Sequence, residues 1–326
     1  MTMKFTFTPG VIAVALAGVL PPSAATQKID PDSVIRCIHQ DARGWYWLGT
    51  QSHGVYRFDG RDLTVYTVED GLANNQVRRI VGDSGGAIWF ETASGVSRYD
   101  DGSFRTYTDR DYTSMDKWEL SDGDLWFKGD RSTGFTEQEG RPGAYRFNGS
   151  TLRFHAFPLE IPRQRHDDYS VTRIHRVDGR RVWIATYSAV IGFDGDQFIV
   201  IDDASLGHTD ETGFLHVRSV FEDSKGRLWI GNNGVGVILR EADATVNFTR
   251  AQGVGKAEER GDVLDGKSSL DRVFSIGEDP DGNIWFGTRD HGAWRFDGTA
   301  LRQFTQQDGL QTKMIWDIYT DRNGDL

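Results

Sequence analysis

The side chains best suited to chemistry in this sequence are arginines that return at one position of a repeated pattern. Arg36, Arg78 and Arg218 each follow an aliphatic residue near the start of a predicted strand, at the same place relative to a recurring tryptophan. A guanidinium group grips a carboxylate or sulfate through two parallel hydrogen bonds. Three such groups at one level of a closed ring would form a cationic spot for an acidic sugar or similar anion. Arg272 and His216, at the preceding position, would add to it.

These arginines also have a structural interpretation, because the chain holds 37 Lys and Arg against 48 Asp and Glu. Most arginines in such a chain pair with neighbouring carboxylates, and Asp116 falls at the equivalent position of the third repeat. Trp316 falls at this position as well, and with Trp294, Tyr46 and Tyr56 it could stack on sugar rings. Packing in the core is the competing interpretation for each aromatic residue alone.

Two histidines share another repeat position, just before the glycine in TQSHG and TRDHG. His53 and His291 would be neighbours on the loop-rich side of the ring and are further candidates for ligand binding. A metal or acid–base role would need more ligands, and the equivalent loops offer Ser94, Ala189 and Asn233. The turn aspartates lack the glycine and glutamate spacing of an EF-hand loop. We therefore expect neither a metal nor a cofactor.

A recurring phrase positions these residues. Asp-x-x-Gly-x-(Leu/Ile)-Trp-(Phe/Ile)-Gly-Thr, followed by Gly-x-x-Arg-Phe-Asp-Gly, returns about every 40 to 50 residues. Each copy has four short strands separated by Asp-Gly, Asn-Gly or Gly-Gly turns, which supply the positive backbone angles of tight hairpins. Four-stranded antiparallel units of this period predict an all-β protein, a β-propeller. The marker tryptophans are Trp47, Trp89, Trp126, Trp183, Trp229 and Trp285.

The blade count depends on the last copy. Six full units precede residues 315–326, which align with 273–284 and therefore correspond to the first strand of a seventh unit. We expect a seven-bladed wheel whose last blade is incomplete, and we interpret the chain as truncated at Leu326. A six-bladed wheel with a dangling strand is the alternative.

Both the N-terminus and the charge balance bear on location. Residues 1–25 resemble a cleavable signal peptide, with Lys4, an apolar run over 11–20 and a small-residue cleavage site. Residues 26–33 then form a linker and 34–326 the propeller. No later run is apolar enough for a membrane span, so we expect a periplasmic or secreted protein. The formal net charge of -11 argues against nucleic acid as a partner.

Strand order in a meander assigns the loops to two faces. The Asp-x-x-Gly and Phe-Asp-Gly turns share one face, and the Thr-x-x-His-Gly and Asp-Gly-Leu loops share the other. The large insertions all fall on the second face, where a rigid scaffold commonly carries its binding site, although loops also accept extra length without function. They cover residues 130–143, 158–170, 202–216 and 250–272.

The repeats resemble the two-component regulator propeller family over about residues 34–326. That resemblance implies a seven-bladed wheel that recognises a ligand, often a carbohydrate, and signals through an attached histidine kinase. The sequence contains no kinase segment after the repeats, so a separate membrane-bound kinase is the partner that signalling would need. Around Trp126 and Trp183 the turn departs from the family pattern, which predicts local irregularity there. The strongest copies hold Trp47, Trp89, Trp229 and Trp285.

These features together predict an exported, non-catalytic ligand-binding or sensor-type propeller that recognises a carbohydrate or anionic ligand on the loop-rich face. One alternative is a protein-interaction scaffold that docks on a membrane-bound histidine kinase or a surface enzyme. Another is an enzyme similar to the polysaccharide or streptogramin lyases that use propellers. Glycoside cleavage needs paired carboxylates, and the sequence alone assembles no pair from the loop residues Glu160, Asp168, Asp210 and Glu211.

Overall fold

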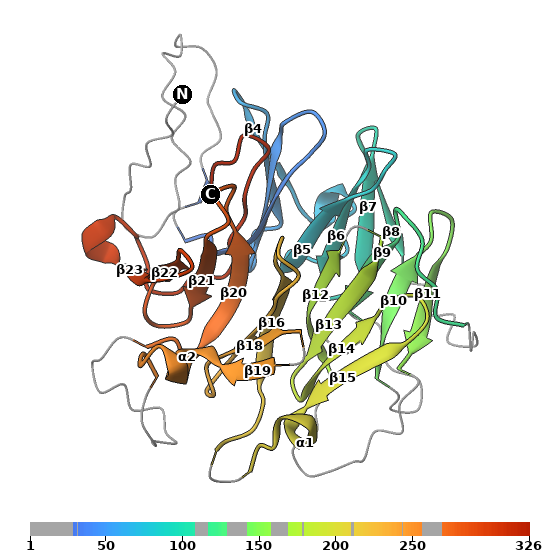
Figure 1. Ribbon diagram of the computed structural model, residues 1–326. Helices are drawn as coiled ribbons and strands as arrows, with labels where there is room; N and C mark the ends of the chain where they lie inside the picture. Colours follow the sequence, from blue (N-terminus) through green and yellow to red (C-terminus); the bar gives the residue numbers. More distant parts are fainter. Residues whose placement is uncertain are drawn as a thin grey trace.

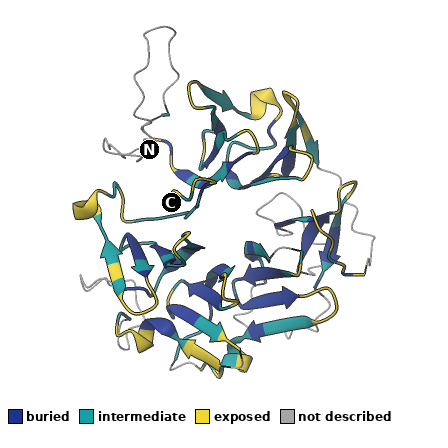
Figure 2. Ribbon diagram, turned by 45° about the horizontal axis from the view of Figure 1, so that its top comes forward, coloured by how far each residue is buried: buried dark blue, intermediate teal, exposed yellow. Residues whose placement is uncertain are grey.

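The computed structural model describes residues 29–30, 32–107, 117–128, 142–157, 169–177, 179–209, 212–242, 244–255 and 269–326. In this part of the chain, the strands form six antiparallel sheets, each made of strands that are consecutive in sequence. The sheets follow one another around a wheel (Figure 1). We refer to them as blades 1 to 6. Buried strands line the middle of the wheel and exposed turns its rim (Figure 2).

The first three blades hold strands β1 to β11. Blade 1 has β1 (Ile35–Gln40), β2 (Tyr46–Thr50), β3 (Val55–Phe58) and β4 (Leu63–Tyr66). Blade 2 has β5 (Val77–Gly82), β6 (Ile88–Thr92), β7 (Val96–Asp100) and β8 (Ser103–Tyr107). Blade 3 has β9 (Leu125–Lys128), β10 (Gly143–Phe147) and β11 (Leu152–Ala156).

The last three blades have four strands each. Blade 4 has β12 (Val171–Val177), β13 (Arg181–Thr186), β14 (Ala189–Phe193) and β15 (Phe198–Asp202). Blade 5 has β16 (Val217–Glu222), β17 (Leu228–Asn232), β18 (Val237–Glu241) and β19 (Ala244–Asn247). Blade 6 has β20 (Val273–Glu278), β21 (Ile284–Thr288), β22 (Ala293–Phe296) and β23 (Leu301–Phe304). Short helices α1 (Asp203–Leu206), α2 (Phe248–Ala251), η1 (Val68–Asp70) and η4 (Gln306–Asp308) follow outermost strands.

A clasp between aspartate and tryptophan explains the repeated phrase. In blade 5, Asp223 Oδ1 accepts from the backbone N–H groups of Lys225 and Arg227 at 3.0 and 2.9 Å, which holds the turn around Gly226 at a φ of 77°. Its Oδ2 accepts from the indole N–H of Trp229 at 2.8 Å. One carboxylate therefore fixes both the turn and the marker side chain. The same indole contact joins Asp41 to Trp47, Asp83 to Trp89 and Asp279 to Trp285, at 3.0, 2.8 and 2.7 Å.

The two copies without this aspartate hold their tryptophans differently. In blade 4, Trp183 donates instead to Glu222 of blade 5, at 2.5 Å. In blade 3, the buried indole nitrogen of Trp126 has no hydrogen-bond partner among the described residues, and its ring stacks on Trp118 with centroids 5.0 Å apart. Blade 4 nevertheless keeps four strands, so the expected irregularity is marked only in blade 3.

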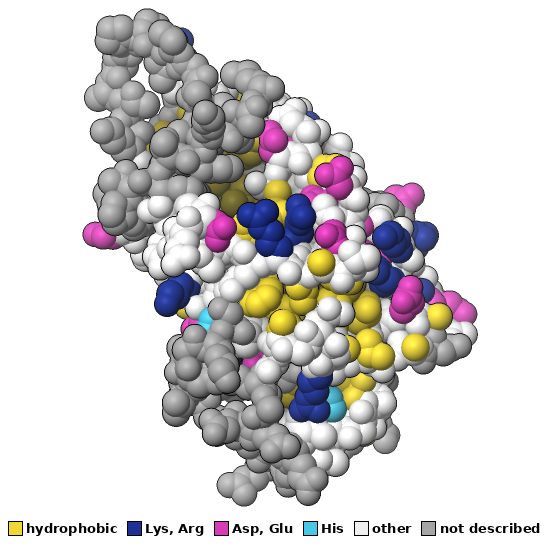
Figure 3. All heavy atoms as spheres, turned by 60° about the vertical axis from the view of Figure 1, so that its left-hand side comes forward, with side chains coloured by type: hydrophobic (Ala, Val, Ile, Leu, Met, Phe, Trp, Pro, Cys, Tyr) yellow, Lys and Arg dark blue, Asp and Glu magenta, His cyan; other side chains and the backbone are white. Residues whose placement is uncertain are grey.

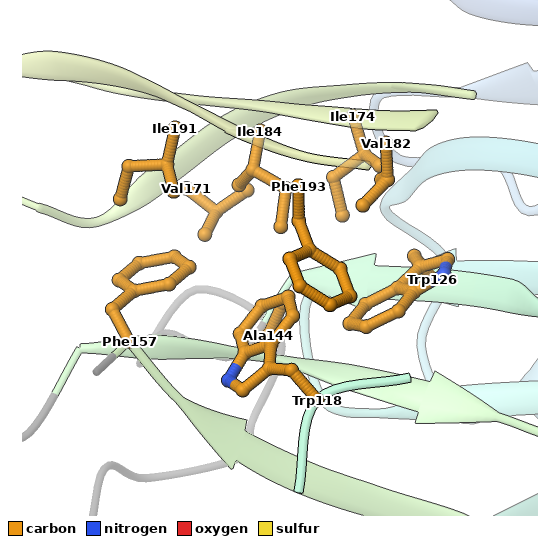
Figure 4. Close-up of a cluster of buried hydrophobic side chains, with 10 residues drawn as sticks. All are labelled: Trp118, Trp126, Ala144, Phe157, Val171, Ile174, Val182, Ile184, Ile191 and Phe193. Atoms are coloured by element: carbon orange, nitrogen blue, oxygen red, sulfur yellow. The ribbon is translucent and has the colours of Figure 1, made fainter. Parts of the chain in front are cut away.

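The core consists of apolar layers between neighbouring blades. Between blades 3 and 4, aromatic rings from one side face aliphatic side chains and Phe193 from the other (Figure 4). Because each meander has apolar residues on both faces, stacking around a ring buries both. The marker tryptophans Trp47, Trp89, Trp126, Trp183 and Trp229 are at most 3% exposed, as blade packing requires.

The prediction of seven blades is wrong, and the six-bladed alternative is confirmed in the part of the chain that the structure describes. Residues 315–320, expected to form the first strand of a seventh blade, are not a strand. They lie against the inner strands of blade 6: the Ile315 N–H donates to the Thr288 carbonyl at 2.9 Å, and Ile318 lies 2.8 Å from the point where a Cβ on Gly277 would stand. The segment occupies an inner-strand position and, in the described part of the chain, pairs with no second strand.

Among the described residues, blade 3 shows the three strands β9 to β11. Its expected inner strand was to begin near Asp116, which lies outside the described residues. Side chains of blade 2 bind the backbone of β9. Glu91 accepts from the Lys128 backbone N–H at 3.0 Å, and Arg79 donates to the Trp126 carbonyl.

Several predictions fall on residues that the structure does not describe. These are the signal peptide, half of the linker, and most of the insertions at 130–143, 158–170 and 250–272. The domain boundaries therefore stay predictions. Within the described ranges, no helix has the length and apolar character needed to cross a membrane. The loop carboxylates outside the described residues are Glu160, Asp168, Asp210 and Glu211.

The clasp predicts a large stability effect at one buried carboxylate. Replacing Asp223 by Ala leaves the indole N–H and two turn amides without their acceptor, and unsatisfied buried donors cost about 1 to 3 kcal/mol each. We expect Asp223→Ala to lower the free energy of unfolding in urea by roughly 3 kcal/mol. The exposed Asp196→Ala is the matched control and should change it by less than about 0.5 kcal/mol. Equal effects of the two substitutions would contradict the clasp's role.

Candidate ligand site at the wheel axis

Each innermost strand carries a β-bulge at the position singled out in the sequence. The register shifts between Ile35 and Cys37 in blade 1, and a shift recurs at the same place in the other four blades that have an inner strand. A bulge leaves one residue unpaired and re-aims its side chain. The bulged residues are Arg36, Arg78, Thr172, Arg218 and Phe274.

Three of the bulged side chains and two neighbouring aromatic rings form a continuous chain of contacts, and the charge of Arg78 acts on Arg36. Arg36 lies over the ring of Trp316 at 4.6 Å, and that ring lies 5.6 Å from Phe274. Arg218 lies over Phe274 at 4.7 Å and over Tyr187 at 5.5 Å. We call Arg36, Arg78, Tyr187, Arg218, Phe274 and Trp316 the axial cluster. It draws residues from blades 1, 2, 4, 5 and 6 and from the segment after blade 6.

The three arginines of the axial cluster bind neutral groups. Arg36 donates to Gln51 at 2.8 Å, Arg78 to Gln76 at 2.8 Å, and Arg218 to the Tyr187 hydroxyl at 3.2 Å. Among the described residues, none of the three lies within ion-pair distance of a carboxylate. The alternative that they serve as ordinary ion pairs is therefore unsupported in this part of the chain. Among the described residues, their charges are therefore not neutralised by a carboxylate partner.

The electrostatics of Arg36 reflect this arrangement. Burial lowers the pKa of its guanidinium, and the positive charge of Arg78 and, less strongly, of Arg218 lowers it further, whereas Glu91 opposes the shift. The three cations therefore lie close enough to repel one another. An anion placed among them would relieve that repulsion. Viewed on one face, Lys and Arg form separate small groups beside exposed hydrophobic side chains rather than a continuous basic surface (Figure 3).

A second layer of charged residues lies directly behind the bulges. Arg173, one residue beyond its bulge, donates to Asp317 at 2.7 Å, although the two residues come from blade 4 and from the segment after blade 6. This carboxylate raises the pKa of Arg173, whereas burial lowers the pKa of Arg79. Asp317 also accepts from the Ile38 backbone N–H at 3.2 Å. We call Arg79, Glu91, Arg173 and Asp317 the hub.

Arg272 and His216 have different surroundings from the axial arginines. Arg272 forms an ion pair with Asp290 at 3.3 Å, which already supplies a carboxylate partner. The His216 ring lies edge-on to Tyr187 with centroids 4.8 Å apart, so it borders the axial cluster. His216 therefore stays a candidate contact, and Arg272 is a weaker one.

His53 and His291 have the shared turn geometry expected from the repeat. Their backbone N–H groups donate to Thr50 and Thr288 at 2.8 Å in each case. The His53 ring lies 3.7 Å from the Asp30 carboxylate, among N-terminal residues rather than in the axial cluster. Their role in ligand binding therefore stays a prediction.

The remaining aromatic candidates are engaged in packing. Trp294 and Tyr56 are 6% and 3% exposed, and the Tyr56 hydroxyl lies 3.0 Å from the Ser33 hydroxyl. Tyr46 donates its hydroxyl to Asp321. Of the aromatic residues proposed for sugar stacking, Trp316 alone joins the axial cluster. The described ranges contain no group of three or more His, Cys, Asp or Glu side chains able to hold a metal ion.

Comparison with known families decides the nature of the repeats. The family model described as two component regulator propeller matches residues 30–52, 214–234 and 267–290. Each match contains an inner strand with its bulge, the clasp turn and the marker tryptophan. These segments are two-component regulator propeller repeats. No curated protein sequence matches the chain.

Solved structures of other proteins share the propeller fold with this chain. The extracellular domain of the hybrid two component system BT4673 from B. thetaiotaomicron is 18% identical, with a TM-score of 0.61, and the alignment covers 90% of this chain and 36% of that one. The extracellular domain of BT3049 from the same organism is 19% identical, with a TM-score of 0.60 and coverage of 90% and 37%. This chain thus spans little more than a third of their length.

A lyase shares the fold too. Virginiamycin B lyase from Staphylococcus aureus, in a catalytically inactive form bound to quinupristin, is 14% identical with a TM-score of 0.56. The alignment covers 85% of this chain and 86% of the lyase. At these identities, the likeness of this chain to all three structures establishes the fold alone.

Sequence reasoning located the bulged positions but missed their cause and the hub. In the inner strands of this propeller, aliphatic residues lie three positions apart, as in Val77 and Ile80 or Val217 and Val220. Strict alternation would place them two apart, so this spacing is a readable signal for a bulge. The sequence signal for the hub is weaker. Arg173 and Asp317 occupy equivalent positions of two repeats, but they come into contact only when the blades close into a ring.

A half-buried histidine beside the hub predicts how stability depends on pH. His39 faces Tyr319 with ring centroids 6.4 Å apart. Burial lowers the pKa of its imidazole from 6.5 to about 4, Asp41 opposes this shift, and Arg322 and Arg79 add to it. The unfolded chain therefore takes up this proton at a higher pH than the folded chain does.

The free energy of unfolding should fall as the pH drops from about 6.5 to about 4, by roughly 3 kcal/mol from this group, and the contribution should level off below pH 4. Urea unfolding of the wild type and His39→Gln at pH values across this range measures it. The variant should show a shallower decline. An identical decline in the two proteins would rule out His39 as a source.

Proposed function

We propose that this chain is an exported, non-catalytic recognition module that binds an anionic ligand, an acidic carbohydrate in the first place, at the axial cluster. The observation that carries the proposal is the set of three bulged arginines whose partners are neutral. Arginine forks match carboxylate and sulfate groups, and a partly buried cation without a carboxylate is the natural complement of an anion.

The surroundings of the arginines support a ligand with both charge and a flat face. Trp316 and Phe274 lie between the guanidinium groups of Arg36 and Arg218, and Tyr187 lies beside Arg218. A sugar ring can pack against aromatic surface while its acidic group binds arginine. His216 borders the same place and could donate a hydrogen bond to a hydroxyl or an acidic group. The axial cluster would thus bind one end of an acidic oligosaccharide.

A sensor role for the module follows from its relatives. The two similar B. thetaiotaomicron structures are extracellular domains of hybrid two component systems, and their propeller fold covers most of this chain. We infer that ligand binding here serves recognition upstream of a membrane-bound histidine kinase. The predicted signal peptide at residues 1–25 agrees with a periplasmic or secreted location.

Double substitution of two axial arginines tests the proposal. Hydrogen bonds to charged groups contribute about 1.5 to 3 kcal/mol each, so Arg78→Gln with Arg218→Gln should weaken binding of sulfated or uronic-acid oligosaccharides by at least about 100-fold. Isothermal titration calorimetry against an acidic panel, with neutral oligosaccharides of equal length beside it, measures this. Binding should also weaken as salt is raised.

Arg61→Gln is the matched control, because Arg61 lies on the turn face opposite the bulges and its side chain is 74% exposed. The control should bind as the wild type does, and the melting temperatures of all three proteins should agree within a few degrees. Absence of acidic-oligosaccharide binding by the wild type, or unchanged binding by the double variant, would overturn the proposal.

A further inference from the structure

The cations of the axial cluster lie on two sides of the axis. Arg36 and Arg78 are on the inner strands of blades 1 and 2, which are neighbours in the wheel (Figure 1). Arg218 is on blade 5, and residues 315–320 lie between blade 6 and blade 1, where they bind both. Counted around the ring in either direction, Arg218 is therefore three positions from the nearest of the other two arginines. Two cations face one cation across the axis.

These side chains are accessible to solvent because of the bulges. In each of the five inner strands that the structure describes, the aliphatic residue before the bulge is buried, as Val77 and Val217 are. The bulged residue that follows is half-buried, and so is Trp316. A bulge re-aims its side chain away from the ladder. All three arginines are thus exposed to a ligand rather than enclosed between blades.

The side with two arginines is suited to a single acidic group. Burial is the largest cause of the lowered pKa of Arg36, and the charge of Arg78 contributes more to it than the charge of Arg218. Arg78 is therefore the nearer cation. The described partners of this pair are the amide oxygens of Gln51 and Gln76, each at 2.8 Å. A carboxylate or sulfate shared by the two guanidinium groups would offset their repulsion and accept hydrogen bonds from both.

The opposite side offers a separate place for a second acidic group. The described hydrogen bond of the Arg218 guanidinium is donated to the Tyr187 hydroxyl at 3.2 Å. Arg218 lies 4.7 Å from the centre of the Phe274 ring, whereas Arg36 lies 4.6 Å from the centre of Trp316. Each cation thus stands over a different ring, and the ring centres are 5.6 Å apart. This geometry favours one acidic group for each side.

The flanks between the two sides are uncharged. Phe274 and Trp316 form one flank. On the other flank, the Thr172 hydroxyl donates to a backbone carbonyl at 3.2 Å and adds no charge. One residue beyond these flanks, Arg173 binds Asp317 at 2.7 Å across the axis, so this carboxylate already has a cationic partner. A ligand lying across the axis would therefore meet an uncharged middle and a cation at each end.

We propose that the axial cluster recognises a ligand with two acidic groups held apart by an uncharged portion. Arg36 and Arg78 bind one acidic group and Arg218 binds the other, while the uncharged portion packs against Phe274 and Trp316. The inference rests on the proposed function and narrows it. The ligand becomes an oligosaccharide that carries acidic groups on two of its sugar residues, and a chain with one acidic group is a weaker ligand.

Matched disaccharides measure this preference by isothermal titration calorimetry on the full chain. One pair is digalacturonate and its form with one carboxylate reduced to an alcohol, and the other pair carries two sulfate groups or one on the same neutral disaccharide. In each pair that binds, the diacidic member should bind at least about 10-fold more tightly, because it gains a second charge-assisted contact. Equal affinity within the pairs would overturn the inference and leave the proposed function standing. If none of the four disaccharides binds, both are overturned.

Single substitutions test the assignment of the two acidic groups. Arg218→Gln should weaken the diacidic member at least about 10-fold more than the monoacidic member, because the monoacidic probe binds on the side with two arginines. Arg78→Gln should weaken both members, and the exposed Arg61→Gln should weaken neither. Melting temperatures within a few degrees of the wild type show that the variants are folded. Equal losses for the two members in Arg218→Gln would mean that all three arginines share one acidic group, which would overturn the inference.

Discussion

The bond from the turn aspartate to the marker tryptophan is the contact on which the rest of the wheel depends. A tryptophan is the largest side chain that a blade can bury, and leaving its buried indole N–H without an acceptor costs stability. In blade 5, Asp223 supplies that acceptor from the turn that joins the two inner strands. This one contact thus fixes the turn geometry, the strand register and the packing between blades. The motif recurs because most blades bury a marker tryptophan that needs such an acceptor.

Where the clasp is absent, neighbouring charges take over, and they do so close to the axis. The indole of Trp183 uses Glu222 of the next blade, and the backbone of β9 uses Glu91 and Arg79 of the preceding one. Buried charges of this kind are costly unless each has a partner, so Arg173 and Asp317 complete the hub. The same residues tie the segment after blade 6 across the axis. The contacts that bind β9 and those that tie residues 315–320 to blade 4 therefore belong to one group of charged residues.

The fold followed from the sequence as far as the repeat reached. Strands, turns, meander order and buried tryptophans obey local rules, so the copies around Trp47, Trp229 and Trp285 predicted them directly. The blade count did not follow, because residues 315–320 match the strand pattern but a strand exists only when a second one pairs with it. The Arg173 to Asp317 bond was equally out of reach, since it joins residues 144 positions apart that meet only in the closed ring.

The candidate site was predictable for a different reason. A repeat places equivalent residues at one level of the ring, so aligning the copies brought Arg36, Arg78, Arg218 and Trp316 together before any coordinates did. Alignment could not reveal that a β-bulge leaves each of these arginines unpaired in its inner strand. It also could not reveal that their described partners are amides and a phenol rather than carboxylates. An arginine paired with a carboxylate serves the structure, whereas an arginine bound only to neutral groups is suited to an anionic ligand.

The neutral partners of these arginines also indicate where the proposed anion would bind in an acidic protein. With a formal net charge of -11, most of the surface repels anions, and long-range attraction cannot be what draws one in. Arg36, Arg78 and Arg218 act at short range, where burial strengthens their field and where like charges held together gain from a shared counter-ion. Inner strands hold such a group more rigidly than long loops do, because their positions are set by pairing on one side and by the next blade on the other. Under the proposed function, the inner strands of the repeats would therefore hold a preorganised anion site at the axis of the wheel.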